Sequence, residues 1–178
     1  TRSRGLGDVY KRQIKEAKKQ DDKYLLVSID FAKAFDSISY GYIDTVLSLL
    51  NFGPSFRRWV KLFFVKRITY LLLNGFFSKA INLLQSVPQG DILSPYIFIL
   101  VLEFLLLKIN HSRNLSGIKI QDVEQRANTY ADDSSVLLRA TEHNLRYLIS
   151  TLHQFSKVSG LFPNVEKTKV MPLGKTDE

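Results

Sequence analysis

The alternation of apolar and polar positions along the chain predicts an α+β protein. Uncharged runs rich in branched and aromatic residues indicate strands, whereas apolar residues that recur every three or four positions indicate helices. Together these elements are typical of an antiparallel sheet with helices packed on one face. Strands are expected over residues 23–29, 68–73, 76–83, 118–120 and 168–173, a hairpin over 127–138, and helices over 43–50, 54–66, 96–109 and 142–159.

Turn and cap residues support several of these boundaries. Asn74-Gly75 lies between two apolar runs and favours a hairpin with a type I′ turn. Thr141 can cap the last helix at its start, and Gly160 can end it. The hairpin over 127–138 is expected to turn at residues 131–134.

The most apolar segment, residues 96–107, is interpreted as a buried core helix. It reads YIFILVLEFLLL and is interrupted by Glu103. A membrane-spanning helix needs about 20 predominantly apolar residues, so no membrane partner is expected.

Composition indicates one globular domain. The chain has 178 residues, of which 45% are hydrophobic and 12% aromatic, enough for a packed core and against disorder. It contains no cysteine, which excludes disulfides, thiolate metal sites and cysteine nucleophiles. The absence of cysteine also fits an intracellular protein.

The net charge of +8 points to a polyanionic partner such as nucleic acid. The excess is unevenly distributed, because residues 1–20 hold seven Lys or Arg against two acids, a net charge of +5. We interpret residues 1–22 as a basic leader, flexible or non-native, and residues 23–178 as the functional domain. Charge is therefore a weak guide to what the domain does.

Three acids stand at the ends of predicted strands. Asp30 directly follows a buried strand, and Asp132 and Asp133 occupy the predicted hairpin tip. Each alone is a common turn residue. Gathered at one sheet edge, three carboxylates would repel each other unless divalent cations lay between them. Oxygen ligands select Mg²⁺ or Mn²⁺, and paired ions about 3.5–4 Å apart serve phosphoryl transfer. The spacing alone does not show that the acids converge.

Four segments resemble, in this order, motifs A, B, C and D of reverse transcriptases, and the non-LTR (LINE-type) retrotransposon group most closely. They read SIDFAKAFDSI, SVPQGDILSPYIF, TYADDSSVLL and SGLFPNVEKTKV, and the similarity covers about residues 23–174. The resemblance implies a polymerase palm with part of the fingers, and a chain truncated so that the thumb is absent. Pro163 departs from the usual pattern of motif D and makes a strand there doubtful.

The resemblance also implies roles for individual residues. Asp30 and Asp132 would bind two Mg²⁺ ions (or Mn²⁺), with Asp133 as the flanking acid and the carbonyl of Phe31 as a further ligand. The remaining implied site residues are Phe35 as a steric gate against the 2′-hydroxyl, Gln89 and Gly90 against the incoming nucleotide and template, Tyr130 before the paired acids, and Lys167 as a proton donor to pyrophosphate.

The function implied is RNA-directed DNA polymerisation in a LINE-type retroelement, by nucleotidyl transfer from a dNTP to a primer 3′-hydroxyl. The expected partners are an RNA template, a DNA primer, dNTP and the rest of the polyprotein, including fingers, thumb and endonuclease. The expected location is an intracellular ribonucleoprotein, in the nucleus, the cytoplasm or both.

Three other hypotheses about the function stay open at this point. The chain could be a catalytically silent palm fragment, because fingers and thumb are missing. It could be an RNA-dependent RNA polymerase, since Asp36 lies near a second motif A acid of those enzymes, although Phe35 and Tyr130 favour the reverse transcriptase. It could also be a basic nucleic-acid-binding module without catalysis, whose charge would then lie mostly in residues 1–20.

Overall fold

The computed structural model describes residues 11, 14–17, 19, 22–64, 67–83, 92–120, 123–130 and 133–174, with the backbone alone for 128–130 and 133. The chain divides into two compact units. Unit 1 comprises Thr1–Phe31, Leu105–Gln154 and Pro163–Glu178, and unit 2 comprises Ala32–Phe104 and Phe155–Phe162.

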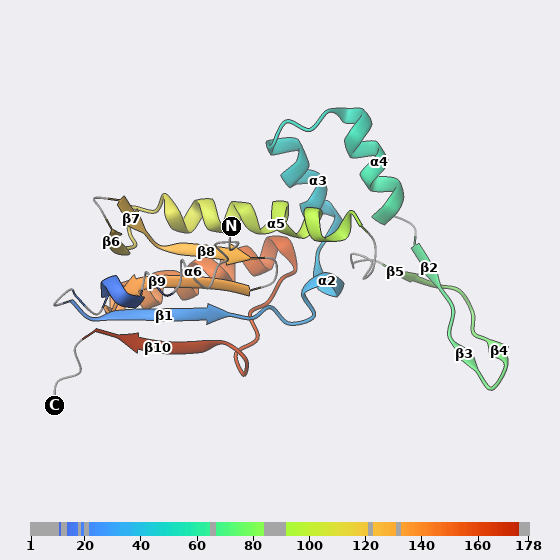
Figure 1. Cartoon of the computed structure of the whole chain (residues 1–178). Helices are drawn as coiled ribbons and strands as arrows, with labels where there is room; N and C mark the ends of the chain where they lie inside the picture. Colours follow the sequence, from blue (N-terminus) through green and yellow to red (C-terminus); the bar gives the residue numbers. More distant parts are fainter. Residues whose placement is uncertain are drawn as a thin grey trace, which may run out of the picture. The chain divides into compact units, whose positions relative to one another are not determined.

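Unit 1 is built on a four-stranded antiparallel sheet (Figure 1). Its strand order is β10-β1-β9-β8, so β1 lies inside the sheet between β10 and β9. A separate two-stranded ribbon pairs β6 with β7. The strands are β1 (Tyr24–Ile29), β6 (Ile118–Ile120), β7 (Val123–Gln125), β8 (Ala127–Tyr130), β9 (Asp133–Arg139) and β10 (Lys169–Leu173).

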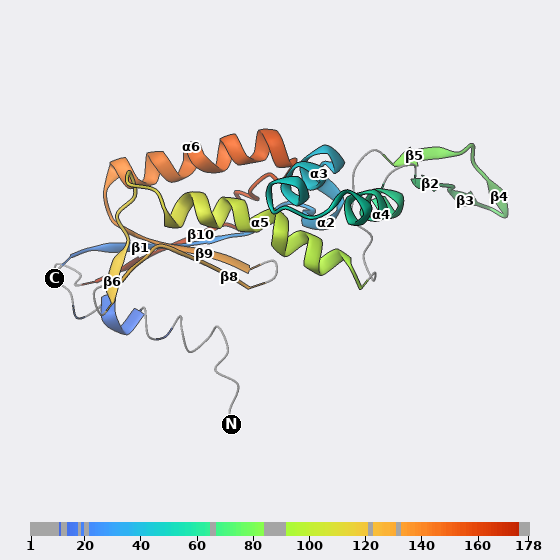
Figure 2. The same cartoon turned by 90° about the horizontal axis from the view of Figure 1, so that it is seen from above.

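Both faces of this sheet are covered, because consecutive apolar residues are buried in its two inner strands, Leu26 and Val27 in β1 and Val136 to Leu138 in β9. Val27 of β1 pairs with Val136 of β9, and both are buried. One face of the sheet is covered by two helices, α5 (Ser94–Asn110) and α6 (Glu142–Ser159), through the parts of them that belong to unit 1 (Figure 2). Burial of each such side chain stabilises the fold by about 1.5–3 kcal/mol.

The opposite face holds a second apolar cluster. Leu26 lies opposite Leu137 in the β1–β9 register, and Ala17 has no exposed surface. Residues 14–17 are helical, so this part of the predicted leader contributes to the core of unit 1. The cluster comprises Ala17, Tyr24, Leu26, Ile118, Ile120, Leu137 and Leu173, with Ile14 packed against it.

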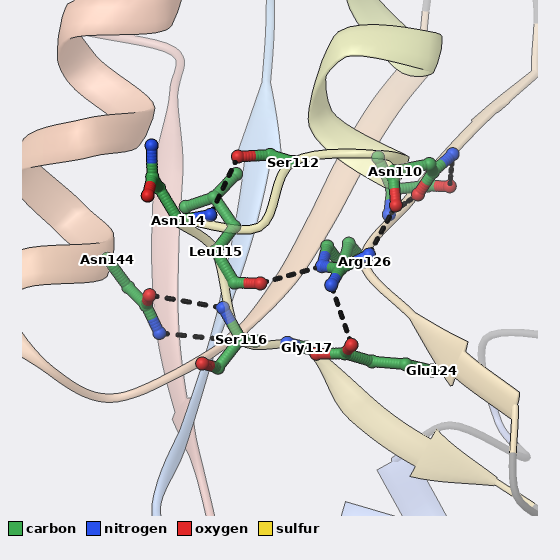
Figure 3. A network of polar contacts seen from close by, with 10 residues as sticks. Asn110, Ser112, Asn114, Leu115, Ser116, Gly117, Glu124, Arg126 and Asn144 are labelled. Atoms are coloured by element: carbon green, nitrogen blue, oxygen red, sulfur yellow. Dashed lines mark hydrogen bonds and ion pairs between the residues drawn. The ribbon is translucent and has the colours of Figure 1, made fainter.

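Asn110, at the end of α5, clamps the outer edge of β8 (Figure 3). Leu137 donates to the carbonyl of Arg126, so the next residue, Ala127, directs its own N–H and C=O away from β9. The Asn110 amide meets both groups: its Oδ1 accepts from the Ala127 N–H at 2.9 Å, and its Nδ2 donates to the Ala127 carbonyl at 3.3 Å. The outward backbone groups of Ala127 thus have hydrogen-bond partners where the β8–β9 hairpin begins.

Arg126 and Asn144 extend this polar network (Figure 3). The guanidinium of Arg126 donates to the carbonyls of Leu115 and Asn110 and to the carboxylate of Glu124. Asn144, almost fully buried in α6, exchanges two hydrogen bonds with the backbone of Ser116 at 3.2 Å. The segment leading from α5 into the hairpin is therefore held from two sides.

Unit 2 is mainly helical and carries a long hairpin. Asp44 of α3 and Arg57 of α4 form a bidentate ion pair at 2.9 and 3.0 Å. Its elements are α2 (Ala34–Ser37), α3 (Tyr40–Leu49), α4 (Pro54–Phe64), β2 (Arg67–Thr69), β3 (Leu72–Leu73), β4 (Phe76–Phe77), β5 (Ile81–Leu83) and the unit 2 portions of α5 and α6.

Two predicted turn positions in unit 2 have the backbone conformation that their residues favour. Asn74 and Gly75 both have positive φ, 50° and 84°, as a type I′ turn requires. Gly160 follows α6 with φ 81°, and a Cβ there would lie 2.3 Å from the carbonyl oxygen of Ser37. Glycine at 160 therefore ends the helix and allows the close approach of the α2 segment.

Most predicted elements are present, with four corrections. The strands predicted over 68–73 and 76–83 are each divided in two, the first into β2 and β3 and the second into β4 and β5. The hairpin tip was predicted at 131–134, but β9 already begins at Asp133, so only two residues separate its strands. The short helix α2 and the strand β7 were not predicted, because elements of four and three residues show no measurable periodicity. In the part of the chain that the structure describes, no helix is long and apolar enough to cross a membrane.

We predict that Asn110→Ala lowers the free energy of unfolding by about 1–3 kcal/mol, because the N–H and C=O of buried Ala127 lose their partners. Denaturant unfolding followed by circular dichroism measures this change. Arg113→Ala is the matched control, since Arg113 is exposed in the same connecting segment. Equal stability of the Asn110→Ala variant and the wild type would contradict the clamp.

Candidate active site

Asp30 lies at the end of the central strand of unit 1. It directly follows Ile29, the last residue of β1, and is partly exposed. Its backbone carbonyl accepts a hydrogen bond from the Asn164 N–H at 2.7 Å. The strand and this hydrogen bond thus fix the backbone of Asp30, and the residue keeps part of its surface exposed.

The β1–β9 register brings Asp133 beside Asp30. Ile29 pairs with Ser134, so the next pair of positions along the two antiparallel strands is Asp30 and Asp133. Opposed positions in such a pair have Cα atoms about 4.5–5.5 Å apart. Tyr130 pairs with Asp133 across the hairpin. Two residues predicted to act together, from motifs A and C, are therefore neighbours at one end of the sheet.

The backbone carbonyl of Phe31 is directed toward the same place. Phe31 forms an isolated bridge with Pro163, and the Asp30 carbonyl points to that side of β1. Because successive carbonyls of an extended chain point to opposite sides, the Phe31 carbonyl points to the β9 side, where Asp133 begins its strand. The ring of Phe31 is buried, which anchors this backbone. Pro163, a departure from the family pattern, takes part in a bridge without needing an N–H.

Lys167 lies in a turn attached to the same end of β1. Asn164 Oδ1 accepts from the backbone N–H groups of Glu166 and Lys167 at 3.2 and 3.4 Å. The Asn164 carbonyl accepts from the Thr168 N–H at 2.8 Å, and the Lys167 side chain is exposed. Asn164 was missed as a site residue by sequence reasoning, although Asn is a favoured turn residue whose side chain can bond the backbone two residues further along.

Phe35 belongs to unit 2 and lies in α2. Its ring packs on Phe98 of α5, with centroids 4.9 Å apart and planes tilted by 32°. Phe35 is half-buried, so it is a packed aromatic that keeps part of its surface accessible. Asp36, the next residue, is exposed.

The remaining predicted site residues lie outside the described residues or are described only by their backbone. Asp132, Gln89 and Gly90 belong to the first group, and the side chains of Tyr130 and Asp133 to the second. Within the described residues, no three His, Cys, Asp or Glu side chains are grouped to hold a metal ion. The separation of the Asp30 and Asp132 carboxylates therefore stays untested.

Two pKa shifts in unit 2 arise from an ion pair and from burial. The hydrogen bonds from Arg57 lower the pKa of the Asp44 carboxyl. Burial raises the pKa of Tyr42, whose ring contacts Phe155, to about 12. Neither Asp44 nor Tyr42 is among the predicted site residues.

Comparison with known sequences is consistent with the order of motifs. A family model described as reverse transcriptase (RNA-dependent DNA polymerase) matches residues 3–175. The chain is 27% identical, over 87% of its length, to the retrovirus-related Pol polyprotein from type-1 retrotransposable element R2 of Popillia japonica. It is 30% identical, over 80% of its length, to the corresponding polyprotein from type-2 retrotransposable element R2DM of Drosophila melanogaster. The chain spans 22% and 13% of these two relatives.

Solved structures share the fold. A structure of telomerase from Candida albicans in complex with a fragment of telomeric RNA matches 94% of this chain and 30% of the telomerase chain, with a TM-score of 0.65 and 13% identity. A structure of apo telomerase from Candida tropicalis matches 98% of this chain and 36% of that chain, with a TM-score of 0.64 and 13% identity. These matches confirm the predicted α+β palm fold.

The family match distinguishes between the alternatives that the sequence left open. A model for reverse transcriptases covers nearly the whole chain, which favours this class over an RNA-dependent RNA polymerase and over a merely basic binding module. Both relatives named above are polyproteins of R2 retrotransposable elements. The chain therefore belongs to the reverse transcriptase (RNA-dependent DNA polymerase) family, as a reverse transcriptase domain of a non-LTR retrotransposon.

Proposed function

We propose that this chain carries the catalytic centre of an RNA-directed DNA polymerase that uses two metal ions. The observation that carries the proposal is the pairing of β1 with β9, which makes Asp30 and Asp133 neighbouring positions at one end of the sheet. The backbone carbonyl of Phe31 points to the same side of β1. Asp132, which precedes Asp133 in the chain, completes the proposed set of ligands.

The donor set fits magnesium. Carboxylate and carbonyl oxygens are hard ligands that prefer Mg²⁺ or Mn²⁺ over softer metals. In the proposal Asp30, Asp132 and the Phe31 carbonyl hold two ions, with Asp133 flanking them. When bound, such a pair of ions lowers the pKa of an attacking hydroxyl and neutralises charge on the leaving oxygen.

The other residues have supporting roles in this proposal. The Phe35 ring limits room for a 2′-hydroxyl. Gln89 and Gly90 lie against the incoming nucleotide and template, and Tyr130 contacts the substrate beside the paired acids. Exposed Lys167 donates a proton to pyrophosphate or stabilises its charge.

The proposed partners follow from this chemistry. They are an RNA template, a DNA primer, a dNTP and the other parts of a retroelement polyprotein, within an intracellular ribonucleoprotein of the nucleus or cytoplasm. The net charge of +8 is favourable for contact with a polyanion. The similarity to polyproteins several times longer supports a role as one part of a larger enzyme.

Primer extension on an RNA template with Mg²⁺ tests the proposal. Two proteins are compared: the chain by itself, and the Popillia japonica R2 Pol polyprotein in which this chain replaces the matching segment. Extension by the chimera supports the proposal, and extension by the chain alone excludes a silent palm. If the unmodified polyprotein extends the primer and the chimera does not, although both are folded, the proposal is wrong.

We predict that Asp30→Asn lowers the rate of nucleotide addition by the active protein by about 10³-fold or more. Loss of one metal ligand removes several kcal/mol of transition-state stabilisation, and each 1.36 kcal/mol is tenfold in rate. Single-turnover primer extension at saturating dNTP measures the change.

Asp36→Asn is the matched control, since Asp36 is an exposed acid six residues along the chain. It should change the rate by less than about threefold, because it lies in α2 and is not among the proposed ligands. A comparable loss in both variants would show that the effect is not specific to the metal site.

We predict that Phe35→Ala raises ribonucleotide incorporation relative to deoxynucleotide incorporation by about tenfold or more. Removing a steric contact with one group of a substrate changes discrimination by roughly 1–3 kcal/mol. The ratio of kcat/KM for dNTP and rNTP on one template measures the effect.

Phe98→Leu controls for lost packing, because it disturbs the same ring contact without changing position 35. It should leave the ratio unchanged. An unchanged ratio in Phe35→Ala, or an equal change in Phe98→Leu, would remove Phe35 from the gate.

A further inference from the structure

The turn over residues 164–168 is attached to the catalytic end of β1 at both of its ends. At its start, the Asn164 N–H donates to the Asp30 carbonyl at 2.7 Å. Immediately after it, Lys169 pairs with Ser28 in the β1–β10 register. Only four residues lie between these two attachments, so the turn has little freedom to move away from Asp30.

The Asn164 side chain accepts two hydrogen bonds inside this turn. Its Oδ1 accepts from the N–H groups of Glu166 and Lys167, and its carbonyl accepts from the Thr168 N–H. One residue therefore makes four hydrogen bonds, one to the Asp30 strand and three to the turn. The exposed residues of the turn, such as Val165 at 85% exposure, supply no packing that could replace them.

We propose that Asn164 is a positioning residue that holds Lys167 beside the Asp30 end of the sheet. This inference rests on the proposed function, in which Lys167 acts on pyrophosphate. A lysine side chain is long and flexible, so fixing its backbone restricts where its ammonium group can reach. The Asn164 side chain supplies this restriction through its two hydrogen bonds, and the backbone N–H of the same residue attaches the turn to the strand that carries Asp30.

A double-mutant cycle tests the positioning role in the active chimera. Asn164→Ala is expected to lower the rate of nucleotide addition at saturating dNTP by about tenfold, because a misplaced proton donor loses much of its effect. In a Lys167→Ala background the same substitution should cost less than about twofold, since Asn164 then has nothing to position. Equal losses in both backgrounds would overturn the proposal in favour of a structural role.

Two further variants sharpen this test. Asn164→Ser keeps an acceptor oxygen that makes the same turn more weakly, so it should restore part of the rate. Val165→Ala alters an exposed residue of the same turn and should leave the rate unchanged. The proposal is contradicted if Asn164→Ser adds nucleotides no faster than Asn164→Ala, or if Val165→Ala is as slow as Asn164→Ala.

Amide hydrogen exchange on the chain gives a readout that does not depend on activity. Loss of the Asn164 side chain should speed exchange of the Glu166 and Lys167 amides by about fivefold or more, because each loses its acceptor. Unchanged exchange overturns the proposal even if the enzyme is active. Failure of the wild-type chimera to extend a primer overturns the proposed function, whereas the exchange result still decides whether Asn164 holds the turn.

Discussion

The antiparallel pairing of β1 with β9 is the interaction on which the candidate site depends. Its register places Ile29 opposite Ser134 and so makes Asp30 and Asp133, more than 100 residues apart in the sequence, neighbours at one end of the sheet. A slip of one residue would move Val136 and Leu138 to the opposite face of the sheet and Leu137 to theirs, so buried side chains that pack on one face would have to repack on the other. The apolar core therefore fixes the position of the acids.

The register is also held at the end of the hairpin farthest from the acids. β8 is the edge strand, and the outward backbone groups of Ala127 would need partners in any register. Asn110 supplies both partners from α5, and Arg126 ties the preceding segment to Leu115 and Glu124. The base of the hairpin is therefore held by polar contacts that do not involve the acids.

Sequence patterns predicted the long elements and the turns, but not the side-chain hydrogen bonds that connect them. β1, α5 and α6 were predicted because their apolar residues form strong runs or periodicity, and Asn74-Gly75 and Gly160 because their φ values need such residues. The contacts of the Asn110 side chain could not be predicted, since they depend on which backbone groups of a distant strand lack partners. The identities of Asp30 and Asp133 came from motif resemblance, and their proximity came only from the strand register.

The position of β1 inside the sheet explains how two consecutive residues can serve one site. The carbonyl of Asp30 points toward the β10 side, where Asn164 occupies it, so this residue has only its carboxylate to offer a ligand. The carbonyl of Phe31 points toward β9, while its ring is buried, so this residue has only its backbone to offer. Under the proposed function, an acid followed by a large apolar residue at the end of a central strand thus supplies two different oxygen ligands. Asp30 keeps the hydrogen bond from Asn164, and the Phe31 ring stays buried.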